Sequence, residues 1–166
     1  RNYAKSFASG DYMLVIDADE RVEPSCVPGF RQFIQREDFD IGVVPLHQAT
    51  SKTAAFEAVV SGQERSGNPV LLPRVLTLQS DWEYEGAVHE TPGREMQSWA
   101  RYMFVPLHII HHGADSQWRE SRQKSDRNLQ LIEAQIDEYN ESPLHWGYLF
   151  SELMNANRKR EAYRAL

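Results

Sequence analysis

The fold is decided by residues 10–20, which read GDYMLVIDADE. Residues 12–16 form an unbroken apolar and aromatic run, and a short run of this kind predicts a buried strand. The run leads directly into three acids, Asp17, Asp19 and Glu20. Ligands of open α/β sheets bind at the carboxyl ends of the strands. We therefore expect a binding site at this end of the predicted strand.

The two aspartates suit a divalent cation. Strand alternation would send the side chains of Asp17 and Asp19 to the same side of the sheet. Two neighbouring carboxylates repel each other, and their hard oxygen atoms are ligands that Mg²⁺ and Mn²⁺ accept. The alternative is a strand that ends in a solvated acidic turn, because Asp-X-Asp is a short and common pattern.

The surroundings of the motif are similar to the centre of the family 2 glycosyltransferases, which have the GT-A fold. Arg1-Asn2 in a helix, Gly10-Asp11 at its end and the strand into Asp17-Ala18-Asp19 carry the resemblance. It is close over residues 1–30 and looser as far as residue 115. The resemblance implies that Asp19 binds a divalent metal ion, Mn²⁺ or Mg²⁺, which in turn binds the diphosphate of a sugar nucleotide. Asp17 would join this site through a metal-bound water or bind the ribose of the donor.

The resemblance also implies the fold class and the domains. We expect an α/β protein with part of a GT-A domain over residues 1–115, built as a mixed sheet with flanking helices. The half that binds the nucleoside precedes the Asp-X-Asp motif in this family. We therefore expect the chain to be part of a longer protein and to lack the base-binding pocket.

Residues 116–166 have a different pattern. Leu129, Ile132 and Ile136 recur at helical spacing, and a second helix is predicted near 144–156. Paired helices of this length resemble the start of tetratricopeptide-type repeats, and one pair alone cannot form a stable array. We expect an α-helical tail that could bind a protein partner.

The remaining pattern predicts further strands and helices. Alternating or apolar runs indicate strands over 40–47, 56–60, 70–78 with an interruption at Pro73, and 102–113. Helical spacing or stop signals indicate helices over 2–9, near 24–36 and from 158 onward.

The composition is that of an ordinary soluble globular protein, with 41% hydrophobic and 25% charged residues. A net charge of −6 argues against nucleic-acid binding. Cys26 is the only cysteine, so no intrachain disulfide can form and a reducing compartment is the simpler expectation. We expect a cytoplasmic protein, either free or peripheral at the inner face of the membrane.

A second candidate cluster is Gly86-Ala87-Val88-His89-Glu90. Related glycosyltransferases carry Gly-X-X-His-Glu at this place. The resemblance implies that Glu90 is the base that removes the proton of the acceptor in an inverting transfer, with Glu85 less favoured. His89 would orient this base or contact phosphate. The alternative is an exposed glutamate at a strand end beside a histidine that the backbone satisfies.

The third cluster contains His108, His111 and His112. Neighbours on a strand point to opposite faces, so His111 and His112 cannot both enter one site without a bulge. The resemblance matches His111 to a histidine that completes the metal shell in this family, and imidazole is an acceptable manganese ligand. The alternative is a structural histidine at a strand end.

Arg74 and Trp82 are candidate substrate-binding residues. The guanidinium of Arg74 matches phosphate oxygens, although an ordinary surface ion pair is equally compatible with its position. Trp82 and Tyr84 could stack on a sugar ring or belong to the core.

These features predict a metal-dependent inverting glycosyltransferase that moves a sugar from a nucleotide-diphosphate donor to a glycan, lipid-linked or peptide acceptor. Two alternatives stay open. The same aspartate pair could serve a metal-dependent nucleotidyl- or phosphoryltransferase. A truncated, non-catalytic scaffold could instead act through its helical tail.

Overall fold

The computed structural model describes residues 1–86, 88, 90–112, 122–138 and 143–165. The chain forms two compact units, Arg1–Glu83 with Pro92–Arg119, and Tyr84–Thr91 with Glu120–Leu166. The predicted boundary between residues 115 and 116 lies outside the described residues.

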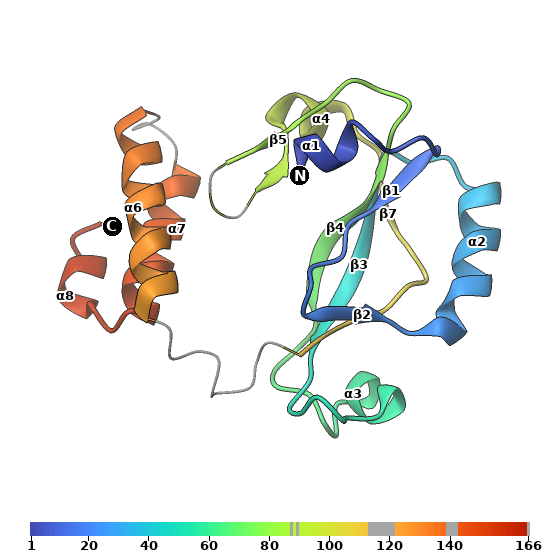
Figure 1. The fold of residues 1–166 in the computed structure, drawn as a ribbon, viewed down its shortest axis with the longest axis horizontal. Coiled ribbons are helices and arrows are strands. Elements are labelled where there is room, and N and C mark those ends of the chain that lie inside the picture. The colour runs from blue at the N-terminus through green and yellow to red at the C-terminus, as the bar shows by residue number, and fades with distance from the viewer. Residues whose placement is uncertain (87, 89, 113–121, 139–142, 166) are drawn as a thin grey trace. The chain divides into compact units, whose positions relative to one another are not determined.

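The first unit is built on a mixed sheet with flanking helices (Figure 1), which confirms the predicted α/β class and is consistent with a partial GT-A fold. In the described part of the chain the strand order is β1-β4-β3-β8-β2, and β7 also pairs with β3. Both β7 and β8 run parallel to β3, whereas the other pairs are antiparallel. The strands are β1 (Tyr12–Leu14), β2 (Glu20–Val22), β3 (Ile41–Gln48), β4 (Val70–Thr77), β7 (Tyr102–Phe104) and β8 (Ile109–His111).

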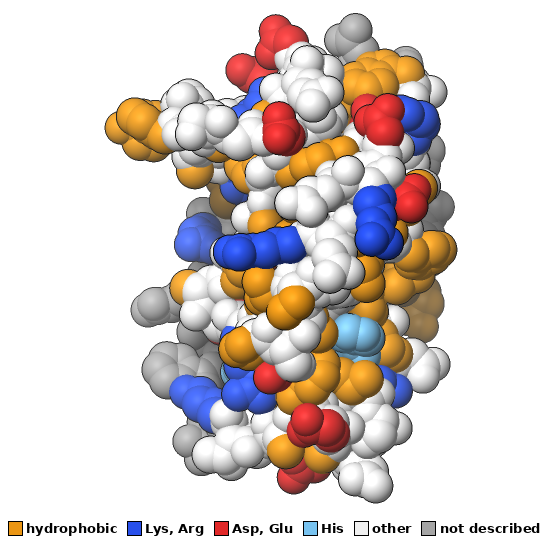
Figure 2. All heavy atoms as spheres, turned by 90° about the vertical axis from the view of Figure 1, so that its right-hand side faces the viewer, with side chains coloured by type: hydrophobic (Ala, Val, Ile, Leu, Met, Phe, Trp, Pro, Cys, Tyr) orange, Lys and Arg blue, Asp and Glu red, His pale blue; other side chains and the backbone are white. Residues whose placement is uncertain are grey.

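The helices described in this unit are short, apart from α2. They are α1 (Asn2–Lys5), a 3₁₀ turn at Pro24–Cys26 followed by α2 (Val27–Arg36), α3 (Phe56–Ser61) and α4 (Arg94–Trp99). The predicted helix near 24–36 is thus present, whereas α4 was not predicted. On the side of the molecule where α2 lies, apolar, basic and acidic side chains are interspersed (Figure 2).

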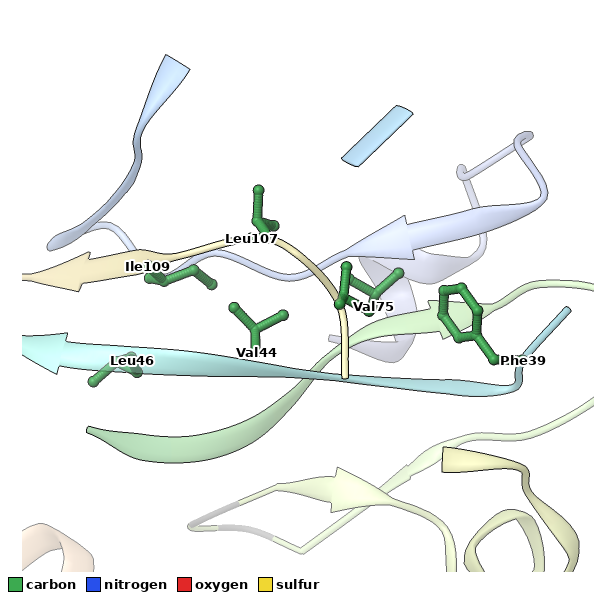
Figure 3. Packing of buried hydrophobic residues seen from close by; sticks show 7 residues of the cluster. Phe39, Val44, Leu46, Val75, Leu107 and Ile109 are labelled. Carbon is green, nitrogen blue, oxygen red and sulfur yellow. The ribbon is translucent and has the colours of Figure 1, made fainter. Parts of the chain in front are cut away.

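The main core lies between the sheet and α2. Phe30, Phe33 and Ile34 of α2 pack against a buried apolar cluster, which Figure 3 shows from close by. Each buried side chain of this size contributes roughly 1.5–3 kcal/mol through the hydrophobic effect. The cluster consists of Phe39, Val44, Leu46, Val75, Val105, Leu107 and Ile109.

Residues 56–60 form a helix, so the predicted short strand was wrong. Phe56, Val59 and Val60 have helical spacing, Val59 is fully buried, and the other two pack against the same small cluster. The helix α3 ends at Gly62, whose φ of 96° is in the left-handed region that favours glycine. A five-residue apolar run fits both kinds of element, and the packing face decides between them.

The predicted strand over 102–113 is split into β7 and β8. Between them the chain still follows β3, because the N–H of Val105 donates to the carbonyl of Val43 at 3.0 Å. Leu107 in this connection is buried in the core. A separate two-stranded sheet contains β5 (Tyr84–Glu85) and β6 (Thr91–Pro92).

The second unit contains the predicted helical tail. Its helices are α6 (Arg122–Glu138), α7 (Pro143–Asn155) and α8 (Lys159–Ala162). The predicted face of α6 is buried against Leu149 and Leu153 of α7. The relation to tetratricopeptide repeats stays a prediction. Among the described helices, none combines the length and the apolar character that a membrane span requires.

Candidate functional site

The Asp-X-Asp motif lies in a tight turn that leads from β1 to β2. The N–H of Glu20 donates to the carbonyl of Asp17 at 3.0 Å, and the carboxylate of Glu20 accepts from the N–H of Asp17 at 2.9 Å. The strand β1 ends at Leu14, and Ile16 is 43% exposed. The prediction of a strand as far as residue 16 was therefore wrong. Strand alternation does not determine where the two aspartates point.

Arg74 reaches this turn from a β-bulge in β4. In the pairing of β3 with β4, Gly42 lies opposite Val75 and Val43 lies opposite Pro73. Arg74 is thus the extra residue of the bulge, a feature that redirects side chains near functional sites. Pro73 lacks an N–H, and bulges are among the few places where a strand tolerates proline.

The guanidinium of Arg74 binds two of the three acids. Its Nη2 donates to Oδ2 of Asp17 at 3.0 Å and also forms an ion pair with the carboxylate of Glu20. Nη2 of Arg1 donates to the other oxygen of Asp17 at 3.1 Å. The side chains of Arg74 and Glu20 are 7% and 2% exposed. The pair is therefore buried, and loss of either partner would leave an uncompensated charge away from water.

Burial and the arginines shift the two carboxyl groups in opposite directions. Burial raises the pKa of Glu20, and the hydrogen bond from Asp17 and the charge of Arg74 offset this only in part. Burial also acts to raise the pKa of Asp17. There, however, the hydrogen bonds and charges of Arg74 and Arg1 outweigh it and hold the pKa below its ordinary value. Asp17 is accordingly an ionised partner of two arginines.

Asp19 contacts His111 instead. Oδ2 of Asp19 lies 3.0 Å from Nε2 of His111, and Nδ1 of His111 lies 2.7 Å from Oε1 of Gln48. The backbone fixes this contact, because the N–H of His112 donates to the carbonyl of Asp19 at 2.9 Å. The side chains of Asp19 and His111 are 53% and 23% exposed. The pair is thus within reach of a solvent-borne ligand.

The other two histidines of the predicted cluster have different surroundings. Nδ1 of His108 lies 2.9 Å from Nε2 of His47. The other ring nitrogen of His47, Nδ1, lies 3.2 Å from Nη1 of Arg65. Burial and the nearby positive charge of Arg21 lower the pKa of His112. Of the three histidines, the structure thus brings His111 to Asp19.

Trp82 is buried in the first unit. It is 5% exposed, its indole N–H donates to the carbonyl of Thr77 at 2.7 Å, and Nζ of Lys5 lies 4.4 Å from the ring centroid. This is the environment of a core aromatic residue, and stacking on a sugar stays a prediction. Glu90 belongs to the second unit and His89 lies outside the described residues, so their catalytic roles also stay predictions.

The 3.0 Å between Asp19 and His111 is the length of an ordinary hydrogen bond, and it is also compatible with two ligands of one hydrated divalent cation. Within the described residues, no three His, Cys, Asp or Glu side chains are grouped so as to hold a metal ion. Two ligands at right angles and ~2.1 Å from an octahedral ion lie about 3.0 Å apart. The observed separation of Oδ2 and Nε2 is 3.0 Å. Mg²⁺ commonly takes one or two protein carboxylates and completes its shell with water and phosphate.

The sequence pattern did not single out Gln48 or assign a role to Arg1. Gln48 follows the predicted strand 40–47 directly, and the carboxyl ends of strands are where ligands gather. That rule could have drawn attention to Gln48, but only the pairing of β3 with β8 shows that it lies opposite His111.

Comparison with known families matches residues 1–80 to the model of Glycosyl transferase family 2. The matched segment contains Asp17, Asp19, Glu20 and Arg74, but it ends before His111. A comparison with curated proteins found no match.

Proposed function

We propose that the chain is part of a metal-dependent, inverting glycosyltransferase, because residues 1–80 match the model of Glycosyl transferase family 2. The donor is a nucleotide-diphosphate sugar. The acceptor is a hydroxyl or another nucleophile on a glycan, a lipid-linked molecule or a peptide. Asp19 and His111 hold a divalent cation that binds the diphosphate of the donor.

The observation that supports this proposal best is the 3.0 Å contact between Asp19 and His111, which are 92 positions apart in the chain. It joins the acidic turn after β1 to the end of β8. An oxygen and a nitrogen donor with octahedral spacing, both in contact with solvent, are a suitable anchor for Mn²⁺ or Mg²⁺.

The charges around the pair favour a cation as well. Asp17, Asp19 and Glu20 carry three carboxylates, and Arg1 and Arg74 supply two guanidinium groups. When all three acids are ionised and His111 is neutral, the cluster keeps one net negative charge. The arginines neutralise Asp17 and Glu20, so the uncompensated charge is on Asp19, where the cation is proposed to bind.

Each residue in and around the turn has a separate proposed role. Arg74 and Arg1 hold Asp17 in place and thereby fix the turn from which Asp19 extends. Asp17 also remains the candidate for contact with the donor ribose. Glu90 is the proposed base that accepts the proton of the acceptor hydroxyl, oriented by His89. The bound cation would offset the negative charge that grows on the departing diphosphate.

The proposal is tested by the binding of Mn²⁺ to the 166-residue chain, followed by the electron paramagnetic resonance of free Mn²⁺. Inorganic pyrophosphate serves as the probe for the diphosphate. We expect pyrophosphate to tighten Mn²⁺ binding, and Asp19→Asn to weaken it at least tenfold. Asp38→Asn alters an aspartate that pairs with Arg101 outside the cluster and should leave the affinity unchanged. Equal affinity in Asp19→Asn and the wild type would refute the site.

A further inference from the structure

Gln48 contacts one of the two ring nitrogens of His111. Oε1 of Gln48 lies 2.7 Å from Nδ1 of His111. A carbonyl oxygen accepts hydrogen bonds and cannot donate them, so Nδ1 must carry the hydrogen atom of this contact. In the neutral ring the other nitrogen, Nε2, is then left with its lone pair.

That lone pair faces a second acceptor. Nε2 of His111 lies 3.0 Å from Oδ2 of Asp19, and an ionised carboxylate is an acceptor only. Two acceptor atoms at this distance repel each other unless a proton or a metal ion lies between them. A metal ion that takes Nε2 and Oδ2 as ligands satisfies both atoms, while the hydrogen bond from Nδ1 to Gln48 stays as it is.

The backbone holds the two side chains in this relation. Gln48 and His111 are paired residues on the parallel strands β3 and β8, and side chains of paired residues on adjacent strands lie on the same face. The N–H of Ala49 donates to the carbonyl of His111 at 3.0 Å, and the carbonyl of Gln48 accepts from Ser66 at 2.8 Å. Both residues thus project from hydrogen-bonded backbone, with little freedom to separate.

We propose that Gln48 is a positioning residue for the cation site. It keeps the proton of His111 on Nδ1 and presents Nε2 to the cation beside Asp19, so that the ring binds without rotation or exchange of its proton. This inference rests on the proposed function, because it assigns Gln48 to the same cation site. Partners that orient a metal-binding histidine typically contribute a factor of roughly 10–100 to metal affinity.

Two substitutions at Gln48 distinguish the effect of its acceptor oxygen from the effect of the size of its side chain. Gln48→Leu removes the acceptor and keeps a side chain of similar size, whereas Gln48→Glu keeps an acceptor at the same place. Gln63→Leu is the matched control, because Gln63 is exposed in the turn after α3. Thermal unfolding of each variant shows whether it is folded before binding is compared.

The first measurement is the ¹⁵N NMR spectrum of the His111 ring in the metal-free chain, at a pH at which the ring is neutral. The two nitrogens have distinct shifts according to which one carries the proton. We expect the wild type, Gln48→Glu and Gln63→Leu to carry it on Nδ1. In Gln48→Leu the proton should move to Nε2, where it can bond to Asp19.

The second measurement is the affinity for Mn²⁺ alone. We expect Gln48→Leu to bind Mn²⁺ at least tenfold more weakly than the wild type, and Gln48→Glu and Gln63→Leu to bind it about as tightly as the wild type or better. If Gln48→Leu is folded, keeps the proton on Nδ1 and binds Mn²⁺ normally, the role of Gln48 is refuted while the cation site stands. If the wild type binds no Mn²⁺, both this inference and the proposed function fail.

Discussion

The guanidinium of Arg74 lies 3.0 Å from the carboxylate of Asp17, although 57 positions separate them in the chain. The contact exists because a bulge in β4 leaves Arg74 unmatched by β3 and directs its side chain to the turn after β1. The same guanidinium also pairs with buried Glu20. Arg74 therefore links the bulge of β4 to the acidic turn through its contacts with Asp17 and Glu20.

Arg74→Met should destabilise the protein by about 3 kcal/mol at neutral pH, because it leaves the Glu20 carboxylate buried without its cation. Arg74→Lys should recover only part of the loss, because an ammonium group lacks the planar fork of a guanidinium. Urea unfolding followed by circular dichroism measures both. Arg101→Met is the control, since Arg101 pairs with Asp38 and Asp40 on the surface and should matter little. Equal losses in Arg74→Met and Arg101→Met would contradict the account.

Buried His47, which contacts half-buried His108, predicts a second stability effect, which depends on pH. Burial, then the neighbouring His108 and Arg65, lower the pKa of His47 to about 4. The unfolded chain takes up this proton near pH 6.5 and the folded chain does not. The stabilising contribution of the buried, neutral His47 is therefore present above pH 6.5 and is lost as the pH falls toward 4.

We expect the free energy of unfolding to decrease by about 3 kcal/mol over this interval, given roughly 1.4 kcal/mol per pKa unit. His47→Gln should remove the part of this dependence that His47 causes, whereas His108 and His112, whose pKa values burial also lowers, would cause the rest. Urea unfolding between pH 4.5 and 7.5 provides the comparison. A variant that retains the full slope would show that another group causes it.

Gly42 offers a test of the packing beneath the site. A Cβ at this position would lie 2.8 Å from Cβ of Val75 and 2.5 Å from Val105, closer than such atoms approach. Gly42→Ala should therefore cost roughly 1–3 kcal/mol through overpacking.

The matched control is Gly29→Ala within α2, where a Cβ would meet nothing within 4 Å. This change should stabilise the protein by up to ~1 kcal/mol, because alanine is the better helix former. Thermal unfolding of the two variants should shift in opposite directions. A neutral Gly42→Ala would mean that the strands can move apart at this point.

The class of the fold could be predicted from the sequence because its local patterns are strong. The strands β3 and β4 and the helices α2, α6 and α7 follow apolar periodicity over many residues. The short run at 56–60 could not be assigned, since five residues fit a helix and a strand equally well. The end of β1 was placed too late because Val15 and Ile16 are apolar, although the strand ends at Leu14.

The candidate site was predictable in its residue types but less so in its contacts. Asp19 and His111 were both expected at a cation, and the structure brings their side chains together. The contact of Arg74 with Asp17 depends on the bulge in β4, and the contact of Arg1 with Asp17 depends on the position of the start of α1. Neither position follows from the local sequence around Asp17. The neighbour of His111, Gln48, depends on the register between parallel strands, which no local pattern encodes.

The most direct test of the central claim is the pulsed electron paramagnetic resonance spectrum of Mn²⁺ bound to the chain. A histidine nitrogen that ligates Mn²⁺ modulates the electron spin echo. We predict that this nitrogen modulation is present in the wild type, is lost in His111→Asn and is retained in His112→Asn. A wild-type spectrum without nitrogen modulation, or a modulation that survives in His111→Asn, would contradict the claim that Asp19 and His111 hold the cation together.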